Sequence, residues 1–345
     1  MNYIELVSIE NIFAAWDGFK KGKRNKLDVM YFERYLEDEL FQLQTELSTQ
    51  TYVHQLYSQF HVWDPKFRVI HKAEVRDRVV HHLLFNYLEP LFQPSFIRQS
   101  YACQKGKGLH LGVEELTGAL RTASKNYTRT VWCLKLDIRK FFDSIDHEIL
   151  LSLLGERVGD VEVFTLLEHV VRSYSSMQRV GKGISIGNLT SQIFSNIYLN
   201  ELDYFVKNEL QERFYFRYAD DFILVHPERS HLERLLPLIQ EFVAERLQLV
   251  VHPNKIILRK FSQGVDFLGY VLLPHYRVLR TKTKQRMFKQ MSQRVADFNA
   301  GLVDDFGLQQ SLQSYLGLLT HCSGYELGER LKNQVWFQRR DNLWP

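Results

Sequence analysis

The sequence predicts an α+β fold in which helices cover one face of an antiparallel sheet. Three observations lead to this prediction: an apolar run at residues 131–137, two aromatic and β-branched runs at 213–218 and 222–225, and amphipathic stretches between and after them. Their order is strand, helices, strand, strand, helix, strand, which is a split βαβ arrangement. We expect the first run and the turn between the other two to lie on neighbouring central strands.

Composition sets broad limits. A chain of 345 residues is long enough for two or three domains. Its content of 45% hydrophobic and 24% charged residues is that of a globular protein and excludes extended disorder. Lys and Arg total 44 against 40 Asp and Glu, a net charge of only +4. Three widely spaced cysteines, Cys103, Cys133 and Cys322, offer neither a disulfide framework nor a zinc site. The first ten residues lack the features of a secretory signal and there is no run of about 18 apolar residues, so we expect a cytoplasmic protein that does not cross a membrane.

Two basic runs lie near the ends of the chain. The first, Lys20, Lys21, Lys23, Arg24 and Lys26, precedes an apolar stripe that predicts one helix over residues 32–47. The second contains no acid between residues 274 and 294, and there Met287, Met291, Val295 and Phe298 recur at helical spacing. Another helix is expected around Tyr315, Leu316 and Leu319. Either run alone is equally well explained as a solvated face, but two of them favour a groove for a polyanion.

The middle of the chain supplies the remaining elements. We predict helices at 149–153, 163–174, 190–210 and 232–247, a glycine-rich link at 180–187, and a final strand beginning near Leu249.

Carboxylates follow two of the predicted strands. Asp137 ends an apolar strand, and Asp220 and Asp221 occupy a hairpin turn with apolar flanks. Such a turn is most often merely hydrophilic. Carboxylates converging from neighbouring strands nevertheless suit Mg²⁺, and two such ions about 4 Å apart can activate a hydroxyl and stabilise a leaving pyrophosphate. Asp143 is expected to be a turn residue, and Asp146 to be the N-cap of the helix that follows it.

Residues 218–221, Tyr-Ala-Asp-Asp, resemble the YxDD box of reverse transcriptases. Five further blocks resemble motifs of that family and occur in the family's order: 66–70, 75–80, 101–108, 136–145 and 265–270. The resemblance covers about residues 20–300. It implies a right-hand polymerase with an N-terminal segment and fingers at 1–130 (joined by 148–180), a palm at 131–273 of RRM-like split βαβ type, and a helical thumb at 274–345.

The segment 186–192 indicates a subfamily. Most reverse transcriptases have QGxxxSP here, whereas this chain has Ile-Gly-Asn-Leu-Thr-Ser-Gln. An aliphatic residue followed by GxxxSQ resembles the reverse transcriptases of diversity-generating retroelements, which copy a template RNA with errors at adenines. A defence-associated or retron-like bacterial enzyme that copies a cognate non-coding RNA is the alternative. A third possibility, an inactive RNA-binding protein on a polymerase scaffold, conflicts with the retention of all three carboxylates.

The resemblance implies roles for individual residues. Asp137, Asp220 and Asp221, with the backbone carbonyl of Ile138, would hold two Mg²⁺ ions, with Mn²⁺ as a substitute. The residues implied at the nucleotide are Lys66, Arg68, Phe142, Ile186, Gly187, Gln192 and Lys255. Of two adjacent rings, we expect Phe142 to be the gate against a ribose 2′-hydroxyl and Phe141 to lie in the core. Lys255 matches a lysine that protonates pyrophosphate, although a surface lysine explains it equally well.

The resemblance also implies partners. These are dNTPs, a structured template RNA with its primer, the resulting RNA–DNA duplex, and a small basic accessory protein that forms an oligomer, all in the cytoplasm of a bacterial, phage or archaeal host. The duplex would be read by its A-form shape through phosphates and 2′-hydroxyls. The residues expected to contact it are Lys20, Lys21, Lys23, Arg24, Arg277, Arg280, Lys282, Lys284, Arg286 and Lys289.

One substitution tests the subfamily motif. Ile186 replaces a glutamine that touches the nucleotide in most relatives, so fewer polar contacts restrain the base pair. We expect Ile186→Gln to lower the frequency of misincorporation opposite template adenine, measured by sequencing cDNA copied from a defined RNA. An unchanged adenine error spectrum would contradict this hypothesis.

Overall fold

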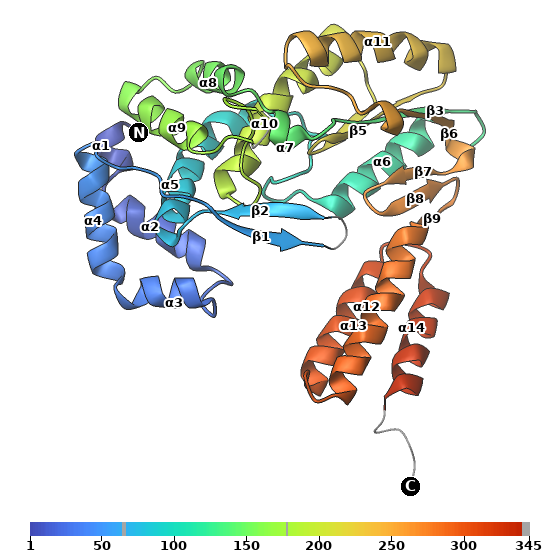
Figure 1. Ribbon diagram of the computed structural model, residues 1–345. Helices are drawn as coiled ribbons and strands as arrows, with labels where there is room; N and C mark the ends of the chain where they lie inside the picture. The colour runs from blue at the N-terminus through green and yellow to red at the C-terminus, as the bar shows by residue number, and fades with distance from the viewer. Residues whose placement is uncertain (64–66, 177–178, 340–345) are drawn as a thin grey trace. The chain divides into compact units, whose positions relative to one another are not determined.

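The structure is a computed structural model that describes residues 1–63, 67–176 and 179–339 (Figure 1). The chain divides into two compact units. The first contains residues 1–105, 136–222 and 235–256, and the second contains residues 106–135, 223–234 and 257–345.

A four-stranded sheet has the strand order β4-β5-β3-β6. Its members are β3 (Trp132–Asp137), β4 (Tyr215–Tyr218), β5 (Asp221–His226) and β6 (Ile257–Lys260), and β6 pairs antiparallel to β3. This is the order of a split βαβ sheet, with β3 beside the β4–β5 hairpin. The α+β prediction and the predicted neighbourhood of the two strand ends are therefore confirmed.

The predicted position of the last strand, beginning near Leu249, is wrong. Val251 forms only an isolated bridge with Ile138, and β6 begins at Ile257. The cause is Pro253, which opens the 3₁₀ turn η3 (Pro253–Lys255). Proline cannot donate to a strand ladder, so pairing resumes only after this turn.

In the described part of the first unit, five α-helices precede β3. They are α1 (Tyr3–Leu6), α2 (Ile9–Lys20), α3 (Leu27–Arg34), α4 (Leu36–Ser48) and α5 (Val75–Phe92), which ends in the 3₁₀ turn η1 (Gln93–Ser95). The single helix predicted over residues 32–47 is wrong, because Tyr35 leaves the helical conformation with φ −117° and ψ 30°. The apolar residues on both sides of this break are nevertheless buried, as Phe32, Leu40, Leu43 and Leu47 show.

The β1–β2 hairpin joins α4 to α5. Strands β1 (Ser58–Val62) and β2 (Arg68–Lys72) pair antiparallel, with Ser58 opposite Lys72 and Val62 opposite Arg68. Figure 1 shows this hairpin as a two-stranded ribbon separate from the central sheet.

The predicted helices between β3 and β4 are confirmed. They follow the short α7 (Phe141–Ser144) and are α8 (His147–Gly155), α9 (Val161–Arg172) and α10 (Leu189–Tyr204), which continues as the π-helical turn η2 (Phe205–Glu209). Asp146 caps α8 by accepting from the backbone N–H groups of Glu148 and Ile149, at 3.0 and 3.3 Å. The predicted N-cap is thus confirmed. Helix α11 (Arg229–Glu245) follows β5 as expected.

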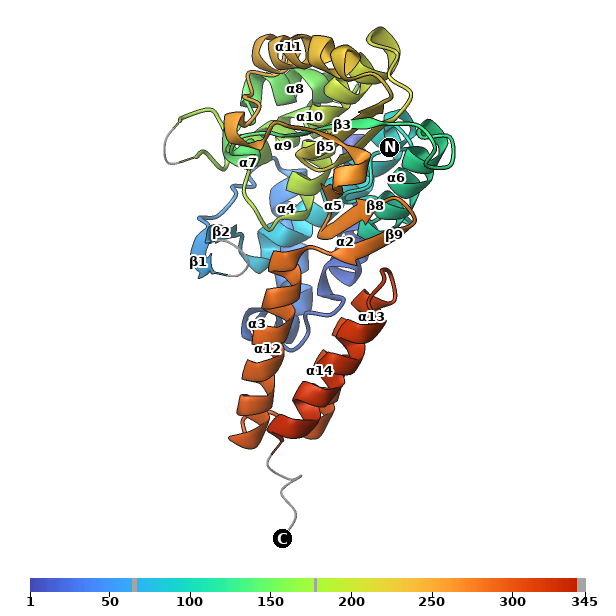
Figure 2. The same ribbon diagram turned by 90° about the vertical axis from the view of Figure 1, so that its right-hand side faces the viewer.

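The second unit combines a small sheet with a helical bundle. It contains α6 (Leu109–Ala123), the 3₁₀ turn η4 (Phe261–Gln263) and the sheet β7 (Val265–Phe267), β8 (Tyr270–Leu273) and β9 (Tyr276–Leu279). Helices α12 (Thr281–Asn299), α13 (Asp305–Leu319) and α14 (Tyr325–Gln338) form the bundle, and Figure 2 shows α12 and α14 side by side. Met287, Met291 and Val295 are buried on α12, as their spacing predicted.

Among the described residues, no helix combines the length and apolar character needed to cross a bilayer.

Candidate active site

Three carboxylates meet where β3 ends beside the β4–β5 turn. Asp137 is the last residue of β3, Asp220 lies in the turn, and Asp221 opens β5. The turn reaches the segment after β3, because the backbone N–H of Ile138 donates to the carbonyl of Asp220 at 3.2 Å. Ala219 adopts φ +51°, the left-handed conformation that makes the turn tight. The structure therefore brings together residues that are 83 positions apart (220 − 137) in the sequence.

Negative charge is concentrated at this point. Burial, and then the carboxylates of Asp137 and Asp221, raise the pKa of Asp220 to about 6. Lys255 acts in the opposite direction, and its Nζ lies 2.6 Å from Asp137 Oδ1. A buried carboxylate beside two like charges is stabilised by any cation that can approach it. One ammonium group already does so for Asp137.

The chemistry of these donors fits a hard divalent cation. Carboxylate oxygens and a backbone carbonyl, such as those of Asp137, Asp220, Asp221 and Ile138, are the ligands that Mg²⁺ prefers. In the conformation observed, however, no group of three or more His, Cys, Asp or Glu side chains in the described part of the chain is arranged to hold a metal ion. In this conformation one oxygen of Asp137 accepts a hydrogen bond from the ammonium of Lys255.

A buried ion pair supports the carboxylate turn. Arg217 on β4 and Asp203 on α10 are both fully buried. The guanidinium donates from Nε to Asp203 Oδ1 at 2.7 Å and from Nη2 to Oδ2 at 2.6 Å, a bidentate contact, and the Tyr215 hydroxyl adds a bond of 2.8 Å to Oδ1. The remaining terminal nitrogen, Nη1, donates to the carbonyl of Ala219 at 3.2 Å and to Asn196 Oδ1 at 3.3 Å.

The backbone of Arg217 also forms hydrogen bonds with the segment 99–101. Its N–H donates to the carbonyl of Gln99 at 2.9 Å, and its carbonyl accepts from the N–H of Tyr101 at 3.1 Å. One residue thus connects β4, α10, the segment 99–101 and the turn that bears Asp220. The sequence did contain a signal, an arginine between the buried Phe216 and the half-buried Tyr218 in an otherwise aromatic strand, but its partner could not be identified from spacing.

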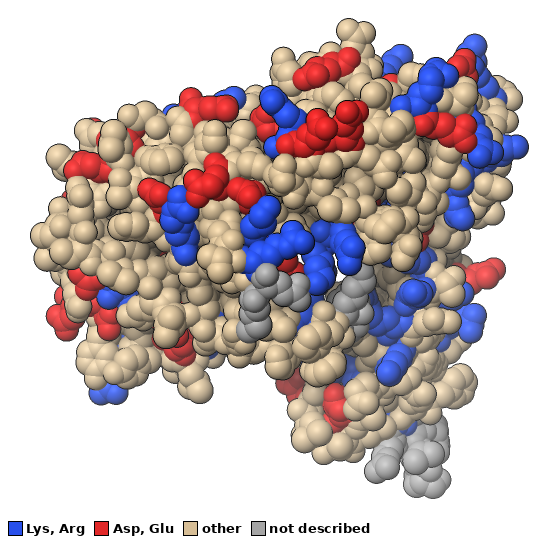
Figure 3. All heavy atoms as spheres, turned by 45° about the horizontal axis from the view of Figure 1, so that its top comes forward, with Lys and Arg blue, Asp and Glu red and all other residues tan. Residues whose placement is uncertain are grey.

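A cavity of about 640 Å³ lies in the same unit. Among the described residues, four cations and one acid line it: Arg68, Arg139, Lys140, Arg179 and Asp143. Figure 3 shows Lys and Arg side chains gathered in the middle of one face of the molecule. The lining does not include the three carboxylates, but it contains Arg139 and Lys140, which directly follow Asp137 and Ile138. Such a cavity is electrostatically suited to a polyanionic ligand.

The residues predicted to contact a nucleotide are only partly gathered there. Arg68 and Ile186 line the cavity. Phe142 is half-buried and lies edge-on to Phe141, which belongs to the core, with ring centroids 5.3 Å apart. Gln192 is exposed on α10.

The other predicted nucleotide contacts are distributed as follows. Lys255 is bonded to Asp137 rather than lying freely on the surface. Gly187 has φ +121°, and a Cβ there would meet Ile70 Cγ2 at 3.3 Å, so a side chain would be strained. Lys66 lies outside the described residues.

Internal partners occupy much of the first basic run. Lys20 pairs with Asp17 at 2.5 Å and Arg24 with Glu33 at 2.9 Å, while Lys23 donates to the carbonyl of Phe19 at 2.6 Å. Lys21 and Lys26 are exposed.

The second basic run belongs to the second unit. Arg280 pairs there with Asp266, and Arg277 is half-buried. Along α12, Lys282 and Lys289 are exposed, and Lys284 and Arg286 are half-buried. Their contact with a nucleic acid remains a prediction.

The sequence was compared with models of known families. The model described as "Reverse transcriptase (RNA-dependent DNA polymerase)" matches residues 63–272, more than half of the chain.

Curated relatives are distant in sequence. "Protein YkfC" of Escherichia coli (strain K12) is 23% identical over 244 residues, covering 60% of this chain and 64% of that protein. The "Putative COX1/OXI3 intron 2 protein" of Saccharomyces cerevisiae is 24% identical, with 59% and 30% covered. The "Group II intron-encoded protein LtrA" of Lactococcus lactis subsp. cremoris is 22% identical, with 65% and 47% covered. The match therefore spans less than two thirds of the length of each of these relatives.

Solved structures of telomerase are also similar. The apo enzyme from Candida tropicalis, truncated from its C-terminal domain, has a TM-score of 0.46 at 13% identity and covers 65% of this chain and 55% of that chain. The Candida albicans enzyme with a fragment of telomeric RNA has the same TM-score at 14% identity, covering 89% and 65%.

The raised pKa of Asp220 predicts a pH-dependent stability. In the folded protein Asp220 keeps its proton up to about pH 6, whereas in the unfolded chain it releases the proton above its ordinary pKa of 3.8. The protonated side chain therefore adds to the free energy of unfolding at low pH, and this contribution is lost as the pH rises through about 6. Asparagine is neutral at every pH. We therefore expect Asp220→Asn to raise the free energy of unfolding by about 2–3 kcal/mol near pH 8 and to change it little near pH 4, measured by urea unfolding in metal-free buffer.

The control for this experiment is Asp38→Asn, which removes an exposed carboxylate from α4. It should change stability by no more than about 0.5 kcal/mol at either pH. An effect of Asp220→Asn that is the same at both pH values would contradict the assignment.

Removal of the buried arginine should be costly. Arg217→Met leaves Asp203 charged and unpaired in the interior, so we expect a loss of about 3–5 kcal/mol in the free energy of unfolding. The matched control is Arg24→Met, which breaks the more exposed pair with Glu33 and should cost less than about 1 kcal/mol. Equal losses in the two variants would show that the buried pair has no special role.

Proposed function

The chain belongs to the reverse transcriptase family, and from this premise we propose that it is an RNA-directed DNA polymerase that makes cDNA from a structured RNA template. The right-hand polymerase fold of the family agrees with the split βαβ sheet. The boundaries that we propose are fingers within 1–130 and 148–180, palm at 131–273 and thumb at 274–345.

The observation that carries the proposal is the meeting of Asp137, Asp220 and Asp221. They stand at adjacent strand ends, within the matched region, and burial together with repulsion from Asp137 and Asp221 raises the pKa of Asp220. Two Mg²⁺ ions held by these carboxylates and the carbonyl of Ile138 would activate a primer 3′-hydroxyl and stabilise the leaving pyrophosphate. Mn²⁺ would substitute, since it accepts the same oxygen ligands.

The protein's own groups supply the rest of the proposed chemistry. The Nζ of Lys255 lies 2.6 Å from Asp137 Oδ1, and after release from that carboxylate it would donate a proton to pyrophosphate. Asp220, with a pKa of about 6, changes its charge close to neutral pH and would become fully ionised as a cation approaches.

The basic cavity is the proposed site of the incoming triphosphate. Arg68, Arg139, Lys140 and Arg179 would balance its charge, with the two-pronged guanidinium groups suited to phosphate oxygens. Phe142, half-buried beside the core ring of Phe141, is the proposed gate against a ribose 2′-hydroxyl.

At a finer level, we assign the enzyme to the diversity-generating class. The support for this is the segment 186–192, in which Ile186 and Gln192 replace the usual Gln and Pro. Copying would then be error-prone at template adenines, within a ribonucleoprotein that includes a small basic accessory oligomer. Lys20, Arg24 and Arg280 form ion pairs within the chain, so fewer cations are left to bind the RNA. This supports a role for a basic accessory protein in RNA binding.

A second candidate function is copying of a cognate RNA without mutagenesis. The names of two similar proteins refer to introns, and one of them is a group II intron-encoded protein. Sequencing the cDNA made from the native RNA separates the candidates, since errors concentrated at template adenines are expected only from the first.

Primer extension on a defined RNA tests the activity. We expect Asp220→Ala to lower the rate by roughly 10³-fold or more, because it removes a proposed metal ligand from a charge-dependent step. Chelation of Mg²⁺ should abolish extension, and Mn²⁺ should restore it. Asp38→Ala, on the exposed face of α4, should extend normally. Equal cDNA yield from the wild type and Asp220→Ala would overturn the proposal.

A further inference from the structure

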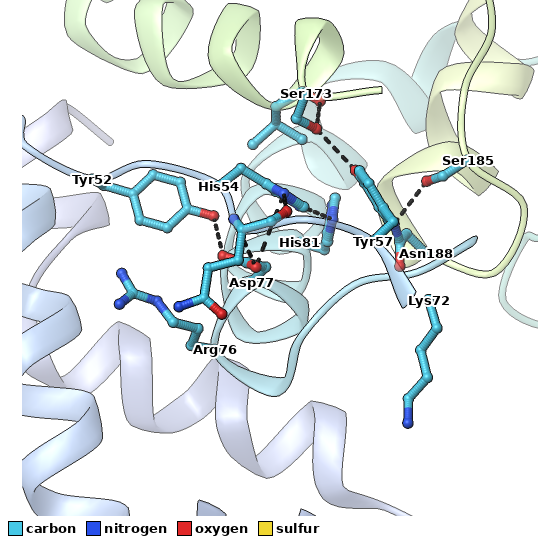
Figure 4. A network of polar contacts seen from close by, with 12 residues as sticks. Tyr52, His54, Tyr57, Lys72, Arg76, Asp77, His81, Ser173, Ser185 and Asn188 are labelled. Atoms are coloured by element: carbon cyan, nitrogen blue, oxygen red, sulfur yellow. Dashed lines mark hydrogen bonds and ion pairs between the residues drawn. The ribbon is translucent and has the colours of Figure 1, made fainter. Parts of the chain in front are cut away.

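A buried chain of polar contacts runs from α5 to the first turn of α10 (Figure 4). Asp77, fully buried, accepts from the Tyr52 hydroxyl at 2.8 Å and from the backbone N–H of Gln55 at 3.1 Å. These bonds hold the segment that carries His54 against the helix. The Nε2 atom of His54 then lies 3.3 Å from Nε2 of His81, and Nδ1 of His81 lies 2.7 Å from the hydroxyl of Thr190.

The two histidine rings connect the segment bound to Asp77 with Thr190. His54 Nδ1 lies 2.6 Å from the carbonyl of Gln55, which can only accept, so this nitrogen carries a proton. Burial lowers the pKa of His81 well below its usual value, which keeps the ring neutral. A neutral imidazole has one donor and one acceptor nitrogen, so His81 bonds to His54 through one nitrogen and to the Thr190 hydroxyl through the other.

A second branch reaches the same segment. The ring of Tyr57 stacks on His54, with centroids 4.7 Å apart, and its hydroxyl contacts Ser173 Oγ at 2.8 Å and the side chain of Ser185. Ser185 Oγ in turn accepts from Asn188 Nδ2 at 2.7 Å. Both ends of the segment 185–190 are therefore attached to one buried network.

Between these attachments lie one residue that lines the cavity, Ile186, and its neighbour Gly187. Ile186 lines the cavity, and Gly187 approaches Ile70 too closely to tolerate a side chain without adjustment. Neither residue has a polar side chain that could hold it in place. Their position is therefore set by the bonds at Ser185 and Thr190.

We propose that His81 is a positioning residue that, through Thr190, sets where Ile186 and Gly187 meet the incoming nucleotide. This inference rests on the proposed function and names the side chains that control nucleotide selection at the same site. None of these network residues is among the proposed metal ligands.

Two substitutions at Thr190 isolate the bond. Thr190→Val keeps the shape but removes the hydroxyl, whereas Thr190→Ser keeps the donor. We expect Thr190→Val to raise KM for dNTP about tenfold with a smaller change in kcat, and to alter the misincorporation spectrum, since an unmade buried hydrogen bond leaves the segment free to shift. Thr190→Ser should restore values close to those of the wild type.

Ser195→Ala is the matched control. Ser195 is buried on the same helix, and its hydroxyl donates locally to the carbonyl of Gln192 at 2.8 Å. It should lower the melting temperature by an amount similar to Thr190→Val while leaving KM and the error spectrum unchanged. If the two variants change KM and the spectrum equally, or if neither changes them, the positioning role is wrong.

Hydrogen exchange separates this inference from the proposed function. Thr190→Val should accelerate amide exchange in residues 185–190 of the full chain, and Ser195→Ala should not. A wild-type protein that makes no cDNA would overturn the polymerase proposal, while the exchange result would still decide whether the network positions the segment. Unchanged exchange in Thr190→Val would overturn the inference.

Discussion

The buried pair of Arg217 and Asp203 is the interaction on which the site depends. Two charges removed completely from water must satisfy each other, and every terminal nitrogen of this guanidinium has an acceptor. Because one of these acceptors is the carbonyl of Ala219, the position of the turn that bears Asp220 is tied to helix α10. Arg217 also pairs through its backbone with the segment 99–101, so the same residue joins sheet, helix and turn.

Electrostatic balance is the second constraint. Burial of Asp220 and, after it, the negative charges of Asp137 and Asp221 raise the pKa of Asp220. Lys255 relieves Asp137, and the four cations of the cavity lie in the same unit without lining the carboxylates themselves. A site built in this way is suited to hold cations and polyanions together, which is the requirement of phosphoryl transfer.

Local patterns predicted much of the fold. The strand that ends at Asp137, the tight turn before Asp221, the cap at Asp146 and the buried stripe of α12 all depend on residues close in sequence, and all are confirmed. The two errors arose where a single residue interrupts a pattern. Tyr35 breaks the apolar helix that was expected to be continuous, and Pro253 delays the last strand. Periodicity is insensitive to such interruptions, because the apolar residues on either side keep their spacing.

By itself, the sequence determined the order of the elements, the presence of carboxylates at strand ends and the family motifs, because each depends on residue type and short spacing. Only the tertiary structure decided which polar groups became partners. Arg217 finds Asp203 on another element, His81 meets Thr190 at a separation of 109 positions, and Lys255 reaches Asp137 across 118. Such pairs form because burial leaves a polar group no water to bond with, and packing alone decides which group lies within reach.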